Sequence, residues 1–230
     1  MPPKISLKEL IMKTGGEYHH YDQMKYIRRN GWDHPDYSHR HGASTTNTFN
    51  LVEKTMKYGL GEGVCLGLSA AYLIAGNNWR KFRDFIRSQE GKAYVRGIMN
   101  LQIEMSRTKR VADNQVNMAF IEFVRIYKVH FIKETRIPNP NLSKHIGDDI
   151  LKNVFPQLGY KIRFFGPWGG HAVAMRIESG RIRFFDPNIG EVSYPYWQRS
   201  SPGMSYFLEH LLNEYYAPVQ FMHIERYTLN

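Results

Sequence analysis

The hydrophobic pattern between Cys65 and Leu158 is mainly helical. The segment Cys65 to Ile74 is apolar on almost every side, which is typical of a helix buried in the interior. From Asn77 to Phe131, apolar and aromatic residues recur at helical spacing, and Pro138 and Pro140 end this region. A further helix is expected from about Ile146 to Leu158.

After Leu158 the periodicity changes to that of strands. We expect strands at residues 160–165, 171–178 and 181–185, a helix near 204–215 and a last strand near 219–227. Helices followed by a sheet predict an α+β fold, with a helical N-terminal half packed on a C-terminal antiparallel sheet.

A β-hairpin is predicted from His171 to Asp186, with Ser179-Gly180 as its two-residue turn. This turn places Glu178 opposite Arg181. One face then carries a row of core residues: Val173, Met175, Ile177, Ile182 and Phe184. His171 and Asp186 end the same face as diagonal neighbours, close enough for their side chains to meet.

Cys65 stands where the chain changes from a glycine-rich turn, Gly61-Glu62-Gly63, to the buried helix. A helix N-terminus carries positive partial charge and free N–H groups, which stabilise a thiolate and can bind an oxyanion. A lone cysteine is more often an inert buried residue, so Cys65 by itself does not establish a nucleophile.

The pair His171 and Asp186 changes that balance. A carboxylate that orients an imidazole, which in turn activates a thiol, is the arrangement of a Cys-His-Asp triad. The competing interpretation is that Asp186 serves only the Asp186-Pro187-Asn188 turn. Taken together, the three positions favour the triad Cys65, His171 and Asp186.

Three blocks of sequence also resemble a known family. They are Gly63-Val64-Cys65-Leu66-Gly67, Gly170-His171-Ala172-Val173 and Phe185-Asp186-Pro187-Asn188-Ile189-Gly190. Together they are similar to the YopT/AvrPphB family of bacterial effector cysteine proteases. The resemblance implies a papain-like fold and cleavage of a host protein after injection into a eukaryotic cell.

On this basis we predict an N-terminal extension, partly loose, at residues 1–58 and a papain-like catalytic domain at residues 59–230. Residues 47–58 are expected to include a short helix. The N-terminus has no apolar signal core, so a non-classical, injection-type route of secretion is expected. A single cysteine excludes an internal disulfide and suits a reducing host cytosol.

Charge and composition limit the classes of partner that the chain is expected to bind. The chain has 31 Lys and Arg against 21 Asp and Glu, a formal net charge of +10, which favours an acidic protein surface or an anionic membrane. No nucleic-acid motif accompanies this charge, and no specific nucleic acid is expected. We expect no cofactor and no metal. A histidine-rich segment with His34, His39 and His41 is interpreted as a solvated loop instead of a metal site.

Two other functions remain open. A Cys-His-Asp triad also serves protein-glutamine deamidases, transglutaminase-type acyl transferases and arylamine acetyltransferases. A non-catalytic binding module on a basic scaffold is the third hypothesis. The side chain that completes the oxyanion hole is unassigned, with Asn47 and Asn50 as candidates, and Trp168 or Trp197 could shield the histidine–aspartate pair from water.

Overall fold

A seven-stranded antiparallel sheet is the centre of the computed structural model, which describes residues 6–31, 64–76, 78–107, 121, 124–138, 145–167, 169–197 and 200–229. The strand order is β1-β6-β5-β4-β3-β7-β2. The strands are β1 (Glu17–His20), β2 (Val129–Pro138), β3 (Leu158–Gly166), β4 (Gly169–Glu178), β5 (Arg181–Asp186), β6 (Gly190–Pro195) and β7 (Phe221–Leu229).

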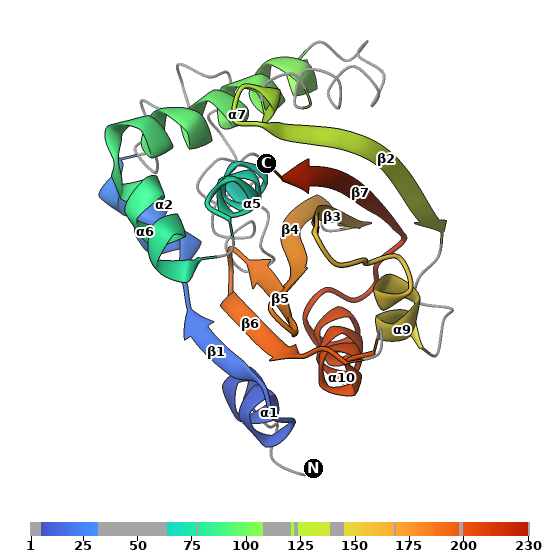
Figure 1. The fold of residues 1–230 in the computed structure, drawn as a ribbon. Helices are drawn as coiled ribbons and strands as arrows, with labels where there is room; N and C mark the ends of the chain where they lie inside the picture. Colours follow the sequence, from blue (N-terminus) through green and yellow to red (C-terminus); the bar gives the residue numbers. More distant parts are fainter. Residues whose placement is uncertain are drawn as a thin grey trace.

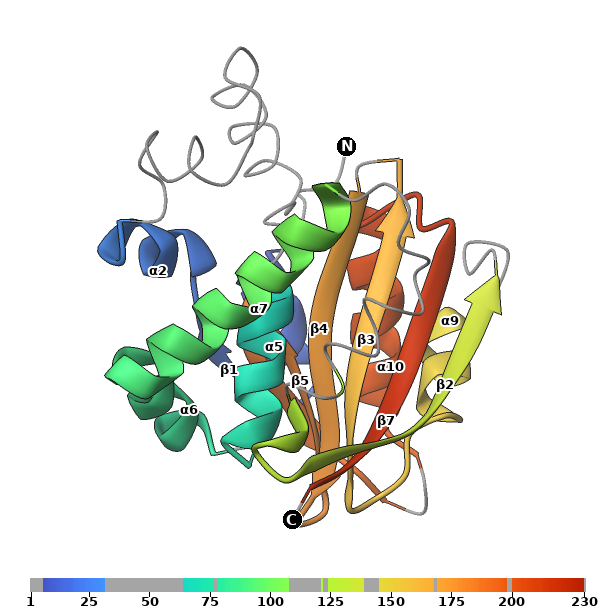
Figure 2. The same cartoon turned by 90° about the horizontal axis from the view of Figure 1, so that it is seen from above.

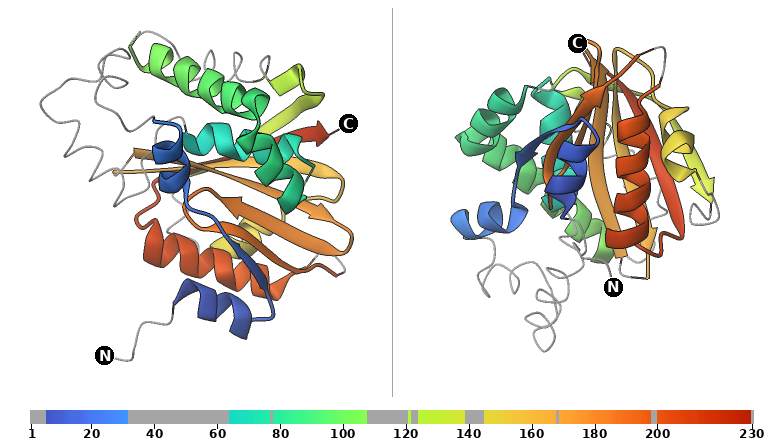
Figure 3. Two further views of the ribbon diagram at one scale, coloured as in Figure 1. Left: turned by 90° about the vertical axis from the view of Figure 1, so that its left-hand side faces the viewer. Right: turned by 90° about the horizontal axis from the view of Figure 1, so that it is seen from below.

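Helices cover both faces of the sheet (Figures 1 and 2). On one face lie α2 (Gln23–Arg29), α5 (Val64–Ile74), α6 (Trp79–Arg87) and α7 (Gln89–Arg107). On the other lie α1 (Leu7–Lys13), α9 (Ile146–Leu151), α10 (Pro202–His210) and the π-helical turn η2 (Leu211–Tyr215). The left-hand view of Figure 3 shows the sheet edge-on between these two layers.

Alternate residues of the central strands therefore supply two separate cores. Val173, Met175 and Phe184 belong to the core beneath α9 and α10. Ala172, Ala174 and Phe185 face the opposite way, into the core beneath α5 and α6. A sheet buried on both faces explains the unbroken apolar run from Ala172 to Met175 in β4. The predicted α+β class, with a helical layer packed on an antiparallel sheet, is confirmed.

The predicted buried helix is α5, and every side chain from Val64 to Leu73 is buried. Two glycines shape it. Gly67 lies where a Cβ would come within 3.0 Å of Val95, so its lack of a side chain lets α7 pack closely on α5. Gly76 has φ of +65°, a conformation that glycine adopts without strain, and it follows the end of the helix.

The β4–β5 hairpin has the predicted register. Ser179 and Gly180 have φ values of +52° and +72°, as a two-residue turn of type I′ requires. Glu178 lies opposite Arg181, and Met175 lies opposite Phe184. The core face and the polar residues at its end therefore fall where the pattern placed them.

Several predictions from the sequence were wrong about where helices end and about which strands exist. The helical region expected as far as Phe131 ends earlier, since β2 begins at Val129. The register of β2 shifts between Phe131 and Lys133, and this irregularity removes the alternation by which a strand is recognised. The helix expected to reach Leu158 ends at Leu151. Strands β1, β2 and β6 were not predicted.

The N-terminal residues that the structure describes form part of the sheet. Strand β1 pairs with β6, with Tyr18 opposite Val192. The short helix expected at residues 47–58 lies outside the described residues, and the division of the chain at residue 58 stays a prediction. In the portion of the chain that is described, we find no helix with both the length and the apolar character needed to cross a bilayer.

Candidate active site

Cys65 is the second residue of α5 and is 3% exposed. Its backbone N–H is one of the first four of the helix, which have no partner within the helix itself. Helix α5 lies along β4 on the same side of the sheet as α7 (Figure 2). The helix therefore brings its positive end and the Cys65 thiol to the strand that carries His171.

His171 and Asp186 meet across the hairpin as the register predicted. Nε2 of His171 lies 2.9 Å from Oδ1 of Asp186, and the side chains are wholly buried. The other ring nitrogen, Nδ1, is buried and has no hydrogen-bond partner within the described chain. The imidazole is thus oriented through one nitrogen, and Nδ1 is left for a further reacting group.

Three donors hold the Asp186 carboxylate. Oδ1 accepts from His171 and also from the backbone N–H of Asn188 at 2.8 Å. Oδ2 accepts from the hydroxyl of Tyr216 at 2.7 Å. Because hydrogen bonds from three directions satisfy it, this buried carboxylate stays aligned with the imidazole.

Tyr216 also covers the histidine. Its ring lies over that of His171, with centroids 4.9 Å apart and an interplanar angle of 22°. The side-chain amide of Asn188 donates to the Tyr216 hydroxyl at 3.1 Å, and Gln23 of α2 donates to the amide oxygen of Asn188. A chain of polar contacts therefore runs from the N-terminal region through Asn188 and Tyr216 to Asp186.

The electrostatics of the pair favour a protonated histidine. Burial alone would lower the pKa of His171. The charge of Asp186 and the hydrogen bond to it outweigh burial, and Cys65 adds to the effect, so that the pKa of His171 is raised to about 10. At neutral pH the ring is then an imidazolium, which lies close enough to Cys65 to interact with its charge.

Residues 35–229 match the Peptidase_C58 family, described as Yersinia/Haemophilus virulence surface antigen. The chain belongs to this family of cysteine peptidases. The resemblance that the three sequence blocks suggested is therefore confirmed, as is the prediction of a thiol hydrolase of the virulence-effector class.

The fold of this C58 peptidase is similar to that of a solved relative. The crystal structure of the Pseudomonas avirulence protein AvrPphB superposes with a TM-score of 0.54 and 17% sequence identity. The match covers 74% of this chain and 93% of that one. It supports the papain-like fold. A search of the curated proteins finds no match.

Other sequence candidates lie elsewhere or outside the described residues. Trp197 is 73% exposed. Asp186 pairs with Gly190 at the start of β6, and Trp197 follows the other end of that strand, so the prediction that it shields the site is wrong. Tyr216 takes that position instead. Asn47, Asn50, Trp168 and the histidine-rich segment lie outside the described residues. Among the residues that are described, no group of three or more His, Cys, Asp or Glu side chains could hold a metal ion.

Four residues that surround the candidate site were given no role from the sequence: Gln23, Ser69, Asn188 and Tyr216. The signal for Asn188 was present in the Asp186-Pro187-Asn188 turn, which was considered only as a rival to the triad. Gln23 and Tyr216 are distant from the hairpin in sequence, and their partners depend on the packing of α2 and η2. No local pattern marks such residues.

Ser69 lies one helical turn after Cys65, and its hydroxyl donates to the backbone carbonyl of Ala172 at 2.9 Å. The side chain is fully buried. This hydrogen bond joins α5, the helix of Cys65, to the strand residue that follows His171. The relative position of Cys65 and His171 is therefore held by a direct link between their elements.

Proposed function

We propose that this peptidase cleaves peptide bonds of a host protein with Cys65 as nucleophile, His171 as proton carrier and Asp186 as orienting group. One observation supports this most strongly. His171 is fixed to Asp186 through Nε2, while its buried Nδ1 is left without a partner among the described residues, on a ring whose pKa responds to Cys65.

Acylation begins from the ion pair of thiolate and imidazolium. The Cys65 sulfur attacks the scissile carbonyl carbon, a C–S bond forms, and the C=O electron pair moves onto the oxygen. The C–N bond then breaks, and His171 gives its Nδ1 proton to the departing amine. The products of this step are a thioester on Cys65, a neutral His171 and the released C-terminal fragment as an amine.

Deacylation uses the same groups in reverse. Neutral His171 takes a proton from water as the water oxygen attacks the thioester carbon. The C–S bond breaks and the acid fragment leaves. The Cys65 thiolate and the protonated His171 then form the ion pair again. Asp186 keeps Nε2 in place and stabilises the imidazolium through both steps without itself being protonated.

The oxyanion is assigned to the start of α5. The backbone N–H of Cys65 lies in the first turn of the described helix, where it has no partner within the helix and where the helix dipole is positive. A preorganised donor of this kind stabilises the tetrahedral intermediate more than the substrate carbonyl. Asn47 or Asn50 remains the proposed side-chain donor.

The proposed location and substrate class of the peptidase rest on its family and its composition. Virulence effectors act on proteins of the host, and a peptidase with a single free cysteine suits the reducing host cytosol. Delivery into the host cell by injection is proposed from the family of virulence effectors. The net charge of +10 favours a substrate with an acidic surface, or one at an anionic membrane.

The direct experiment is to incubate the purified peptidase with a host-cell lysate and to search for new protein N-termini by mass spectrometry. Wild type should generate them, and Cys65→Ala should not. The substitution removes few atoms, so the free energy of unfolding should fall by about 1 kcal/mol or less. A target that stays whole but becomes slightly heavier at a glutamine would show a deamidase instead. New N-termini made equally by Cys65→Ala would refute the nucleophile.

A second experiment tests the ion pair without a substrate. Cys65 is the only cysteine of the chain, so any reaction with iodoacetamide reports on it alone. Wild type should be alkylated rapidly at neutral pH, because a nearby imidazolium favours the thiolate. His171→Ala should slow the reaction, whereas His210→Ala, on α10, should not. Equal rates in all three proteins would contradict the proposed pairing.

A further inference from the structure

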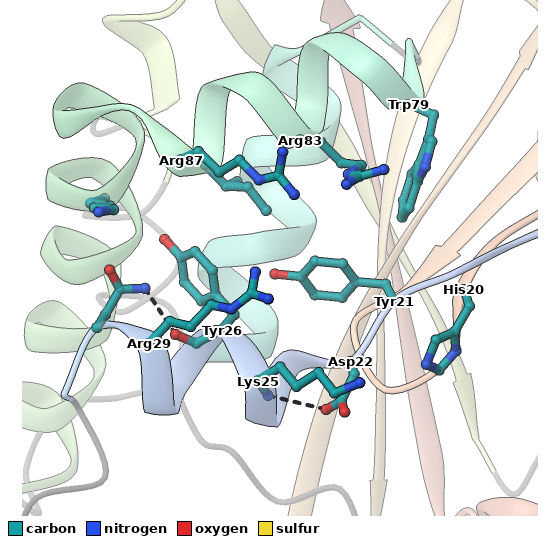
Figure 4. A pocket seen from close by; sticks show the side chains of 12 residues that line it. His20, Tyr21, Asp22, Lys25, Tyr26, Arg29, Trp79, Arg83 and Arg87 are labelled. Carbon is teal, nitrogen blue, oxygen red and sulfur yellow. Dashed lines mark hydrogen bonds between the residues drawn. The ribbon is translucent and has the colours of Figure 1, made fainter.

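A cavity of about 440 Å³ lies between α2, α6 and α7 in the helical layer. Neither Cys65 nor His171 nor Asp186 lines it. Figure 4 shows α2 forming its floor and α6 its roof, with the last residues of the β1 segment closing one end. Its volume is within the range of cavities that hold small ligands.

Five cationic side chains from three helices line this cavity. They are Lys25 and Arg29 of α2, Arg83 and Arg87 of α6, and Lys92 of α7. None of the five forms an ion pair with any residue that the structure describes. The one acidic residue of the lining, Asp22, is committed to the N-terminus of α2, where it accepts from the backbone of Met24 at 2.9 Å. The lining therefore carries five cations against one carboxylate, and no ion pair among the described residues neutralises the five.

A buried hydroxyl points into the same space. The oxygen of Tyr21 is buried and has no hydrogen-bond partner in the described part of the chain. In Figure 4 the ring extends from the β1 segment into the space between α2 and α6, near Arg29 and Arg87. Burial raises the pKa of Tyr21 well above its usual value, so the group stays a neutral donor, and the charges of Arg29 and Arg87 both act on it. A buried donor without a partner is rare in folded proteins unless a ligand or solvent satisfies it.

Aromatic rings form the remaining wall. Trp79 and Tyr21 lie edge to face with centroids 6.2 Å apart, and both line the cavity. The site thus combines a cluster of guanidinium and ammonium donors with a flat apolar surface. Anionic oxygens would meet the donors, and the carbon skeleton that carries them would pack against the rings.

We propose that this cavity binds a compact polyphosphate, a small ring or chain that carries several phosphate groups. Arginine presents paired N–H donors that match phosphate oxygens, and three arginines converge here from two helices. A site that binds an extended acidic peptide would have its cations spread along a surface. The convergence of all five on one hollow that contains a buried hydroxyl favours a compact ligand with dense negative charge.

The test is calorimetry with myo-inositol hexakisphosphate as the probe, on the Cys65→Ala chain. The proposed catalysis plays no part in this measurement, so failure of one proposal leaves the other standing. With the cavity residues unaltered, this chain should bind one ligand per chain, and the binding should be saturable. Arg29→Ala with Arg87→Ala should weaken binding about tenfold or more, because each removes charge-assisted hydrogen bonds.

A matched pair of variants controls for overall charge. Arg28→Ala with Arg80→Ala removes two arginines from the same two helices, but neither residue lines the cavity. Binding should change by less than about threefold, since exposed charges at a distance are screened by salt. Tyr21→Phe, which removes only the hydroxyl, should weaken binding several-fold at unchanged net charge. Circular dichroism and thermal midpoints check that every variant is folded.

Vesicles distinguish the two sources of such a ligand. Binding to vesicles with a polyphosphorylated inositol lipid, but not to phosphatidylserine vesicles of equal charge, would assign the site to a lipid headgroup. Binding of the soluble probe alone would assign it to a free metabolite. The proposal fails if neither phosphate probe binds, or if both arginine pairs weaken binding equally. It also fails if a poly-glutamate peptide alone binds through Arg29 and Arg87, because the ligand would then be an acidic peptide.

Discussion

The hydroxyl of Ser69 donates a 2.9 Å hydrogen bond to the backbone carbonyl of Ala172. One partner lies a helical turn after Cys65, and the other directly follows His171. This bond crosses the interface between α5 and β4, the two elements that supply the proposed nucleophile and the proposed base. A displacement of α5 along the sheet would break it, so the bond holds the distance between thiol and imidazole.

Ser69→Ala is accordingly expected to impair turnover beyond its effect on folding. Loss of the buried hydrogen bond should cost about 1 kcal/mol of unfolding free energy. Misplacement of α5 should lower kcat by roughly tenfold, since catalysis is sensitive to small displacements of the reacting groups. Kinetics and chemical denaturation measure the two effects.

The control for Ser69 is Ser205→Ala. Ser205 is also a buried helical serine, and its hydroxyl donates to Asp148 at 2.7 Å on the other face of the sheet. It should lose comparable stability and keep its turnover. If both variants lose turnover in proportion to stability, then Ser69 has no special positioning role.

Tyr216→Phe should reduce turnover while leaving His171 covered. The phenyl ring preserves the stack over the imidazole, but Asp186 Oδ2 loses its 2.7 Å donor and the Asn188 amide loses its acceptor. We expect a loss of roughly ten- to hundredfold in kcat, the scale of one hydrogen bond to a charged group. Tyr215→Phe, at the exposed neighbouring residue, should be silent. A Tyr216→Phe enzyme with normal kinetics would show that only the ring matters.

Asp186→Asn should damage activity more than stability. Asparagine keeps the shape of the side chain and its turn chemistry but removes the charge that holds His171 as an imidazolium. The equivalent change in a serine triad costs about ten-thousandfold, and a preformed ion pair depends less on its third member, so we expect a loss of roughly ten- to thousandfold. Turnover and thermal midpoint are measured side by side. Near-normal turnover with a collapsed midpoint would reduce Asp186 to a turn residue.

The pH dependence of stability should carry the signature of His171. Its pKa is raised from 6.5 to about 10, so between these values the folded state holds a proton that the unfolded state has released. Stability from this group is fully present below pH 6.5 and is lost as pH rises through about 10. The unfolding free energy of wild type relative to His171→Gln should therefore decline across this range.

The comparison with the variant is needed because Lys161 acts in the opposite direction. Burial lowers the pKa of Lys161 to about 8, so its burial becomes less costly as pH rises above that value. Both proteins share this contribution, and it cancels in the difference. A difference that stays constant from pH 6 to pH 10 would show that His171 has no raised pKa in the fold.

The local sequence determined the helix of Cys65 and the hairpin of His171 and Asp186. Both signals are short-range: an apolar run after glycines, and alternation on either side of Ser179-Gly180. The register of a two-residue hairpin follows from its turn and from the need to keep Arg181 and Arg183 off the core face. That is why the 2.9 Å contact between His171 and Asp186 was foreseeable.

The outer strands were not foreseeable in the same way. Strand β2 carries a register shift, and β1 is a short edge strand with one partly buried side chain, so neither shows clean alternation. Their pairing depends on partners far away in sequence, β7 for one and β6 for the other. A pattern that depends on long-range packing leaves little trace in its own residues.

By itself, the sequence determined the candidate nucleophile, the histidine–aspartate pair and the α+β class, because each depends on turns and periodicity within a few residues. Only the tertiary structure decided what surrounds them. Tyr216 over the imidazole, Ser69 against Ala172 and the five cations around one cavity each join segments that are distant along the chain. Such contacts form when hydrophobic faces pack, and the packing, not the local pattern, selects which polar groups meet.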